Sequence, residues 1–139
     1  MLIDSNILVY AINRSSPKHK KAQRFLQKNL ENLFIAHQNI FETLRVLTHA
    51  KFPSPMRPAD AIVSIENIAK VCKIINPDYK THCIALELVK KYKLSGDKVF
   101  DGYLAATAIS NGVTTIATDN MRDFKRFVEI KVINPFNSN

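Results

Sequence analysis

The chain has 139 residues, 46% of them hydrophobic and 23% charged, so it fits one globular domain and is too apolar for a disordered chain. Its longest apolar run, residues 7–12, is too short to span a bilayer, and its first residues lack the features of a signal peptide. The net charge of +8 favours a polyanionic partner, and we expect a cytoplasmic protein without a membrane segment.

The apolar residues alternate between strand-like runs and helical spacing. Ser16 and Pro17 are typical of a helix start, and Gly112 is typical of a helix end because it readily adopts a left-handed conformation. Three prolines between Phe52 and Pro58 predict a loop between helices. The expected elements, in chain order, are a strand at 1–3, a short helix after Asp4, a helix from Ser16, a strand at 33–36, helices at 39–50 and 58–72, a strand at 73–75, helices at 78–92 and 97–111, a strand at 115–118, a helical turn at 122–127 and a strand at 131–133.

Two expectations concern burial. The cysteines, Cys72 and Cys83, lie outside any spacing typical of zinc ligands and are predicted to be buried free thiols. The helix at 58–72 is predicted to turn one apolar face to the core. The residues of that face are Ala59, Ile62, Val63, Ala69 and Cys72.

The alternation of strands and helices predicts an α/β fold. We expect a single domain over residues 1–139, a three-layer sandwich in which a mostly parallel central sheet of four to five strands carries helices on both faces. In such folds binding sites form at the carboxyl ends of the strands, where the strand order reverses. The residues that follow the strands are therefore the first candidates for a site.

Acidic residues occupy these positions. Asp4 directly follows the first strand, and Asp119 follows the fourth. Glu42 and Asp101 lie near the starts of two helices, and helices of a parallel sheet begin at the same edge. Four carboxylates from four segments are thus predicted to converge.

Each acid also has a purely structural interpretation. Carboxylates are favoured at helix N-termini, where they accept hydrogen bonds from free N–H groups. Asp97 is predicted to cap its helix in this way, and Asp4 could cap the short helix that follows it. The joint placement of several acids in a basic chain favours a shared role instead.

Converging carboxylates repel one another and require a compensating cation. Oxygen ligands without histidine or cysteine suit Mg²⁺ or Mn²⁺. Such ions activate water for the hydrolysis of phosphodiester bonds, which needs no covalent nucleophile. The sequence therefore predicts a metal-dependent nuclease.

Four motifs carry a resemblance to a known family. They are the opening Asp4-Ser5-Asn6, the glutamate of NIFETLRVL, the block DGYLAATAISNGVTTIATDN, and the DF of MRDF. In this order and spacing the chain resembles, nearly end to end, the PIN-domain ribonucleases, and most closely the VapC-type toxins of prokaryotic toxin–antitoxin pairs.

The resemblance implies a PIN-like fold and a Mg²⁺- or Mn²⁺-dependent endoribonuclease. Its partners would be an RNA substrate, such as tRNA or another structured RNA, and a small antitoxin protein, and it would form a homodimer. The family's catalytic and metal-binding acids fall on Asp4, Glu42, Asp101 and Asp119, with Asp123 as a further metal ligand. Polar residues that order the site fall on Asn6 and Thr118.

Cationic and aromatic residues near the acids are candidates for holding RNA. The cations predicted to contact phosphates are Lys98, Arg122, Lys125 and Arg126, whereas those of the helix after Ser16 are expected to form its solvated face. Asp123 has the alternative of pairing with Lys125 or Arg126. The aromatic residues close to the acids are expected to lie mostly in the core, with an exposed minority that stacks on bases: Tyr10, Phe41, Phe100 and Tyr103.

A second function stays open. The fold could serve as a catalytically silent scaffold that binds RNA or protein, with its acids holding a structural ion or none. Metal-dependent cleavage of RNA would distinguish the nuclease from the scaffold.

Overall fold

The computed structural model describes residues 1–137. Its strands are β1 (Leu2–Ile3), β2 (Phe34–Ala36), β3 (Lys73–Ile75), β4 (Thr115–Ala117) and β5 (Lys131–Ile133). Its α-helices are α1 (Ser5–Ile12), α2 (His19–Lys28), α3 (His37–Thr48), α4 (Pro58–Ala69), α5 (Thr81–Tyr92), α6 (Lys98–Ser110) and α7 (Met121–Phe124), and a 3-10 turn spans Leu30–Asn32. The predicted order of strands and helices is confirmed.

The five strands form one sheet in the order β3-β2-β1-β4-β5, and all four pairings are parallel. The chain adds β2 and β3 on one side of β1 and then crosses to add β4 and β5 on the other. The strand order therefore reverses at β1 and β4. Ile3 pairs with Ala117, which places Asp4 and Thr118 side by side just past the ends of these strands.

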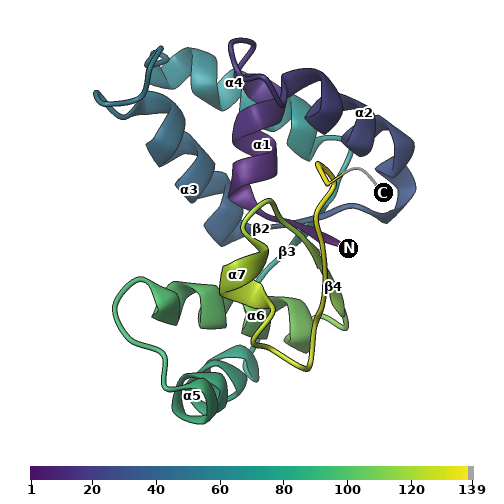
Figure 1. Ribbon diagram of the computed structural model, residues 1–139, viewed down its shortest axis with the longest axis vertical. Coiled ribbons are helices and arrows are strands. Elements are labelled where there is room, and N and C mark those ends of the chain that lie inside the picture. The colour runs from purple at the N-terminus through teal and green to yellow at the C-terminus, as the bar shows by residue number, and fades with distance from the viewer. Residues whose placement is uncertain (138–139) are drawn as a thin grey trace.

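Helices cover both faces of the sheet, as predicted. In Figure 1, α1–α4 (purple to teal) lie above the sheet and α5–α7 (green) lie below it. Side chains of β1 alternate between the two layers: Leu2 belongs to the core beneath α5 and α6, and Ile3 to the core beneath α1 and α2. In this arrangement the N-termini of α3 and α6 both lie at the carboxyl edge of the sheet (Figure 1).

Helix α3 begins at His37, two residues earlier than predicted, and Asn39 lies inside its first turn. The buried Asn39 side chain accepts a hydrogen bond from the backbone N–H of Ala36 at 3.0 Å, which fixes the turn from β2 into the helix. The hydroxyl of Thr43 donates to the carbonyl of Asn39 at 2.6 Å one turn later. The first turns of α3 are therefore held rigidly, and Glu42 with them.

The predicted buried face of α4 is wrong. Ala61 and Ile65 are buried, whereas Ile62 and Val63 are 43% and 56% exposed. The spacing of Ala61 and Ile65 is equally helical, and these two residues pack with Val9 of α1 and Leu47 of α3. The spacing of apolar residues predicts that a helix has an apolar face, but it does not tell on which side the neighbouring helices lie.

Two other local predictions need correction. Cys83 is exposed rather than buried, and Cys72 is only half-buried, although burial still raises the pKa of the Cys72 thiol to about 11. Helix α2 begins at His19 rather than at Pro17, with Ser16 accepting a hydrogen bond from the Lys18 N–H at 3.2 Å. Gly112 has the expected left-handed conformation, with φ of 71°. Within residues 1–137, no helix is long and apolar enough to cross a bilayer.

Candidate active site

Asp4 is the most buried acid of the candidate site. It is 7% exposed, and its backbone N–H donates to the carbonyl of Ala117, so it continues the β1–β4 ladder. One carboxylate oxygen accepts from the N–H of Ser5 at 2.7 Å, which caps α1, and the other accepts from the Thr118 hydroxyl at 2.6 Å. Burial, opposed by these hydrogen bonds and assisted by the charge of Glu42, raises the pKa of Asp4.

Asn6 joins the ends of β1 and β4. Its amide nitrogen donates to Asp4 at 2.8 Å and to the Thr118 hydroxyl at 3.0 Å, and its amide oxygen accepts from the backbone N–H of Asp119 at 3.2 Å. Thr118 is fully buried and also accepts from the N–H of Asn120. Both residues therefore contact Asp4 and the segment that begins at Asp119, and their role in ordering a site stays a prediction.

Glu42 lies on α3 and is linked to Asp4 through a hydroxyl that sequence reasoning did not select. Ser5 Oγ lies 3.0 Å from one oxygen of Glu42 and 3.3 Å from an oxygen of Asp4. The other oxygen of Glu42 accepts from Gln38 Nε2 at 2.7 Å. Both oxygens of Glu42 are thereby held on the side of the open sheet edge.

Asp101 lies opposite these two acids, at the start of α6. The pKa of Asp101 is raised to about 7, and half-burial is the largest cause. The charges of Asp123, Asp4 and Glu42 also raise it, in that order of effect, and the charge of Arg126 lowers it. The structure therefore brings Asp4 and Glu42 close enough for their charges to act on Asp101, and Glu42 close enough to act on Asp4. Burial and repulsion between carboxylates both disfavour the ionised form of Asp101, and a bound cation would favour it.

Asp119 has a different set of partners from the other three acids. Its carboxylate forms an ion pair with Lys18 and accepts from the Tyr10 hydroxyl at 2.9 Å and from Asn134 at 3.3 Å. Partial burial would raise the pKa of Asp119, but these donors outweigh burial and lower it. Lys18 also lies over the rings of Tyr10 and Phe136, at 5.1 and 5.2 Å from their centres.

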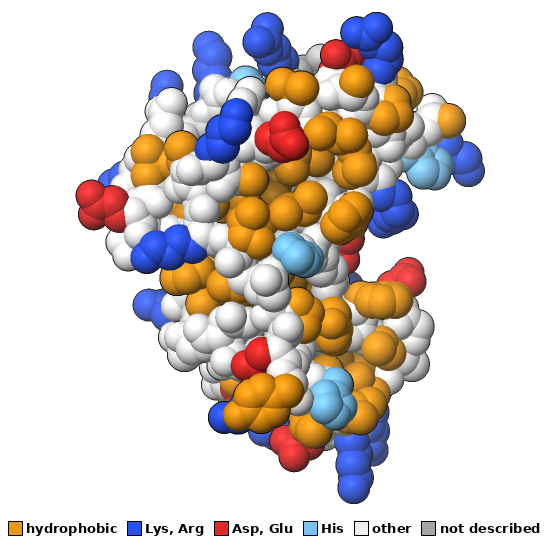
Figure 2. All heavy atoms as spheres, turned by 180° about the vertical axis from the view of Figure 1, so that it is seen from behind, with side chains coloured by type: hydrophobic (Ala, Val, Ile, Leu, Met, Phe, Trp, Pro, Cys, Tyr) orange, Lys and Arg blue, Asp and Glu red, His pale blue; other side chains and the backbone are white. Residues whose placement is uncertain are grey.

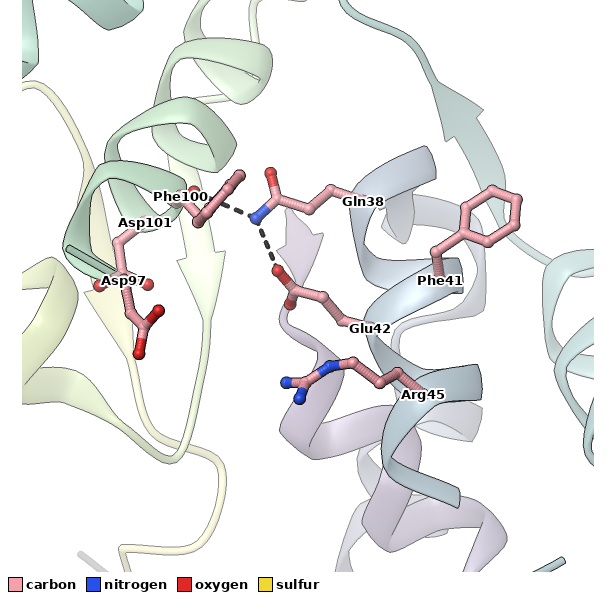
Figure 3. Close-up of a pocket in the computed structure, with 7 residues that line it drawn as sticks. All are labelled: Gln38, Phe41, Glu42, Arg45, Asp97, Phe100 and Asp101. Carbon is pink, nitrogen blue, oxygen red and sulfur yellow. Dashed lines mark hydrogen bonds between the residues drawn. The ribbon is translucent and has the colours of Figure 1, made fainter. Parts of the chain in front are cut away.

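A cavity of about 590 Å³ separates α3 from α6 at this edge. Figure 3 shows Glu42 and Asp101 on its opposite walls, with Gln38 bridging them by hydrogen bonds to Glu42 and to the carbonyl of Phe100. The surface is hollowed on this side, with acidic side chains at the margin of the hollow (Figure 2). The residues that line the cavity are Gln38, Phe41, Glu42, Arg45, Asp97, Phe100 and Asp101.

Asp97 and Asp123 differ from their simplest structural interpretations. Asp97 occupies the N-cap position of α6 but makes no capping hydrogen bond, and its side chain lines the cavity instead. Asp123 accepts a hydrogen bond from Asn120, and among the described residues it forms no ion pair with Lys125 or Arg126. Both acids add negative charge around Asp101.

The acids do not form a closed cage for an ion. Among residues 1–137, no three Asp, Glu, His or Cys side chains lie close enough together to hold a metal. The donors are nevertheless of one kind, carboxylate oxygens, which suits Mg²⁺ or Mn²⁺. An ion at this edge would require side chains from the two walls, Glu42 and Asp101, to turn toward it.

Four polar residues of the site were not selected from the sequence. Ser5 follows an aspartate that was, and its hydroxyl could have been considered for that reason. Lys18 and Asn134 carry no such signal, because they lie 101 and 15 residues from their partner Asp119. Gln38 lies one helical turn before Glu42, and this spacing could have indicated it. The predicted phosphate-binding residues Lys98, Arg122 and Lys125 are exposed, and Arg126 is half-buried near Asp101.

Known proteins share both the sequence pattern and the fold. A family model of the PIN domain matches residues 1–130. Ribonuclease VapC37 of Mycobacterium tuberculosis is 26% identical over 136 residues, which cover 94% of this chain and 93% of that protein. Ribonuclease VapC48 of the same species is 27% identical over 139 residues, covering 96% and 95%.

Solved structures of similar fold include members of toxin–antitoxin complexes. VapBC2 from Rickettsia felis, bound to a DNA fragment from its promoter, gives a TM-score of 0.73 at 21% identity and covers 96% of each chain. VapC20 of Mycobacterium tuberculosis, a sarcin–ricin loop cleaving toxin, gives 0.69 at 16% identity, covering 93% of this chain and 97% of its own. At these identities the likeness is one of fold.

Proposed function

The chain belongs to the PIN-domain family, and from this premise we propose that it is a metal-dependent endoribonuclease, the toxin of a toxin–antitoxin pair. The observation that carries the proposal is the group formed by Asp4, Glu42 and Asp101 at the carboxyl edge of the sheet, with the pKa of Asp101 raised to about 7. Relatives named as ribonucleases match along almost the whole chain, which supports the same reaction.

The site's chemistry favours Mg²⁺ or Mn²⁺ as the cofactor. We assign the metal to the carboxylates of Asp4, Glu42 and Asp101, with Asp119 and Asp123 as outer members of the set. A divalent ion bound there would supply an activated water and positive charge for the phosphate. The same charge would favour the ionised form of Asp101, which neighbouring carboxylates disfavour in its absence.

The surrounding residues of the chain would keep the acids in place. Ser5 holds Asp4 and Glu42 together, and Asn6 ties Asp4 to the start of the β4–α7 loop. Thr118 donates to Asp4 and so leaves one fewer site on that carboxylate for a proton. These contacts orient the carboxylate oxygens before any ligand arrives, which reduces the cost of assembling the site.

The proposed partners follow from the same family. Its solved members include complexes of a toxin with an antitoxin, which supports a small antitoxin protein as a partner of this chain. An RNA substrate, with tRNA and other structured RNAs as the first candidates, fits the net charge of +8. A homodimer and a location in the cytoplasm complete the proposal.

Cleavage of labelled RNAs, tRNAs included, tests the proposed activity. The reactions contain Mg²⁺, Mn²⁺ or EDTA, and wild-type protein is compared with the Glu42→Gln variant. The Glu87→Gln variant is the matched control, because Glu87 is exposed on α5, which does not line the cavity. We expect cleavage that needs a divalent metal, is lost in Glu42→Gln and is kept in Glu87→Gln.

A second site variant, Asp4→Asn, guards against a local effect of Glu42. It replaces an acceptor oxygen with an N–H donor beside Asn6 or Thr118, so its fold is checked by circular dichroism. Cleavage that survives in EDTA or in both site variants would contradict the proposal. Tight RNA binding by wild-type protein without cleavage in either metal would favour the silent scaffold instead.

A further inference from the structure

The exposed phenylalanines of this chain are confined to the candidate active site. The chain has eight phenylalanines, and six of them are buried or half-buried. The other two, Phe41 and Phe100, are 67% and 60% exposed, and both line the acidic cavity. Exposing a phenylalanine forfeits the free energy of burying it, so two such residues at one cavity require a reason.

Each of the two phenylalanines directly precedes, in sequence, an acid of the proposed metal set. Phe41 precedes Glu42 on α3, and Phe100 precedes Asp101 on α6. Figure 3 shows Phe100 beside the Gln38 amide on the α6 side of the cavity, and Phe41 on α3 with its ring directed away from the Glu42 carboxylate. Because Gln38 Nε2 donates to Glu42 at 2.7 Å and to the Phe100 carbonyl at 3.1 Å, the position of Phe100 is fixed relative to Glu42.

We propose that Phe41 and Phe100 are stacking platforms for unpaired bases of the RNA. These bases flank the phosphodiester bond that is cut. The inference rests on the proposed nuclease function and adds two positioning contacts for the substrate, made with bases that can turn outward from a single strand. Every base has a flat face, so aromatic stacking holds single strands with little dependence on sequence. Paired bases are already stacked on each other and cannot use the two rings.

The charges of the cavity argue against a second copy of this chain as its occupant. Glu42, Asp97 and Asp101 line it with a single cation, Arg45. A symmetric contact across this surface would bring two identical sets of acids together, and like charges at an interface cost free energy. A divalent cation bound by the acids would offset their charge and contact a phosphate of the RNA. The exposed Arg45 would add a contact to a neighbouring phosphate.

Binding of a fluorescent RNA tests this directly. The probe is a short unpaired oligoribonucleotide with a 2-aminopurine base, whose fluorescence falls when the base stacks, in the presence of Ca²⁺ to hold the site without turnover. Phe41→Ala and Phe100→Ala are compared with Phe41→Tyr and Phe100→Tyr, which keep the ring. Tyr79→Ala is the matched control, since Tyr79 is 78% exposed outside the cavity.

We expect each alanine variant to weaken binding of the unpaired probe by about tenfold and to lose part of the quenching. The tyrosine variants and Tyr79→Ala should match wild type, and no variant should alter binding of the same strand within a duplex. With Mg²⁺, the KM for cleavage should rise in the alanine variants while kcat changes little, because the lost contact serves binding.

Two results would overturn the inference and leave the nuclease standing. One is wild-type binding and KM in both alanine variants of a protein that cuts RNA. The other is a change of oligomeric state in these variants, measured by light scattering, with unchanged binding per site. Absence of both cleavage and probe binding in wild-type protein would instead refute the nuclease function itself, and the stacking role with it.

Discussion

Ser5 and Asn6 show how two short polar side chains organise a site that is spread over the chain. Each is adjacent or nearly adjacent to Asp4 in sequence, yet Ser5 reaches Glu42 and Asn6 reaches Asp119. Both begin α1, so the cap of that helix and the order of the acids depend on the same residues. A single tripeptide therefore couples the stability of a helix to the geometry of the carboxylates.

Asp101 should destabilise the metal-free protein in a pH-dependent way. Its folded-state pKa of about 7 lies above its ordinary value of 3.8, so the stability present below pH 4 is lost as the pH rises through 7. Asp101→Asn removes this loss. We expect the variant to be more stable than wild type at pH 8 in EDTA, and the difference to vanish at pH 4, as measured by urea unfolding.

The matched control for this prediction is Asp97→Asn. Asp97 lines the same cavity one turn earlier in the chain, so it tests whether removal of any negative charge has the same effect. A larger gain from Asp97→Asn than from Asp101→Asn would contradict the assignment of the strain to Asp101.

Lys18 should stabilise the protein through Asp119. The pKa of Asp119 is lowered, so its contribution to stability is present above its ordinary value of 3.8 and is lost as the pH falls through the folded-state value. The pair is partly exposed, with 38% and 20% of the two side chains accessible, and we expect a coupling of about 1 kcal/mol at pH 7. A double-mutant cycle of Lys18→Met and Asp119→Asn, followed by thermal unfolding, measures it. Purely additive effects would show that the ion pair contributes nothing.

The acids were accessible from sequence because the end of a parallel strand is a fixed place in the fold. Asp4 and Asp119 come just after strands that are recognisable as short apolar runs. Glu42 and Asp101 lie near the starts of two helices, which begin at the same edge of the sheet. The side-chain direction of Asp119 was not accessible, because it depends on Lys18, Tyr10 and Asn134, which come from three other segments.

At the scale of elements, Gly102 of α6 permits a close approach to Leu94, which lies in the loop that joins α5 to α6. A Cβ added at Gly102 would lie 2.6 Å from Leu94 Cδ1, and Leu94 is buried. In a helix interior alanine is more stable than glycine by about 1 kcal/mol, but overpacking a buried contact costs about 1–3 kcal/mol. The close approach should therefore decide the sign of the substitution.

We expect Gly102→Ala to lower the free energy of unfolding by about 1 kcal/mol, measured from the urea midpoint. In a Leu94→Ala background the added methyl group would enter the space left by the leucine, so the same change should be neutral or stabilising there. Equal losses in both backgrounds would show that the contact with Leu94 is not the cause.

Element order was more predictable than element orientation. Strands at 73–75 and 131–133 have the predicted bounds, because short apolar runs between turn signals define them closely. The core face of α4 was not predictable from its own sequence. Ala61 and Ile65 are buried only because α1 and α3 lie on that side, and this depends on connections elsewhere in the chain.

At the scale of the whole molecule, the net charge of +8 predicts that binding of RNA weakens with salt. Arg126 should contribute to this dependence, since it lies near Asp101 closely enough to act on its pKa. In a Glu42→Gln background, we expect Arg126→Gln to reduce the slope of log affinity against log salt by about one. Lys20→Gln, on the exposed face of α2, is the control and should leave the slope unchanged. Identical slopes for the two variants would remove Arg126 from the RNA contact.

The hydrogen bond between Asp4 and Thr118 joins residues 114 positions apart. On the ribosome, the central strand β1 is therefore made well before its neighbour β4. A nascent chain carries Asp4 from the start but cannot complete its surroundings until Thr118 has left the exit tunnel. For a protein that cuts RNA, this order of synthesis delays the assembly of the active site until the segment that carries Thr118 has been translated.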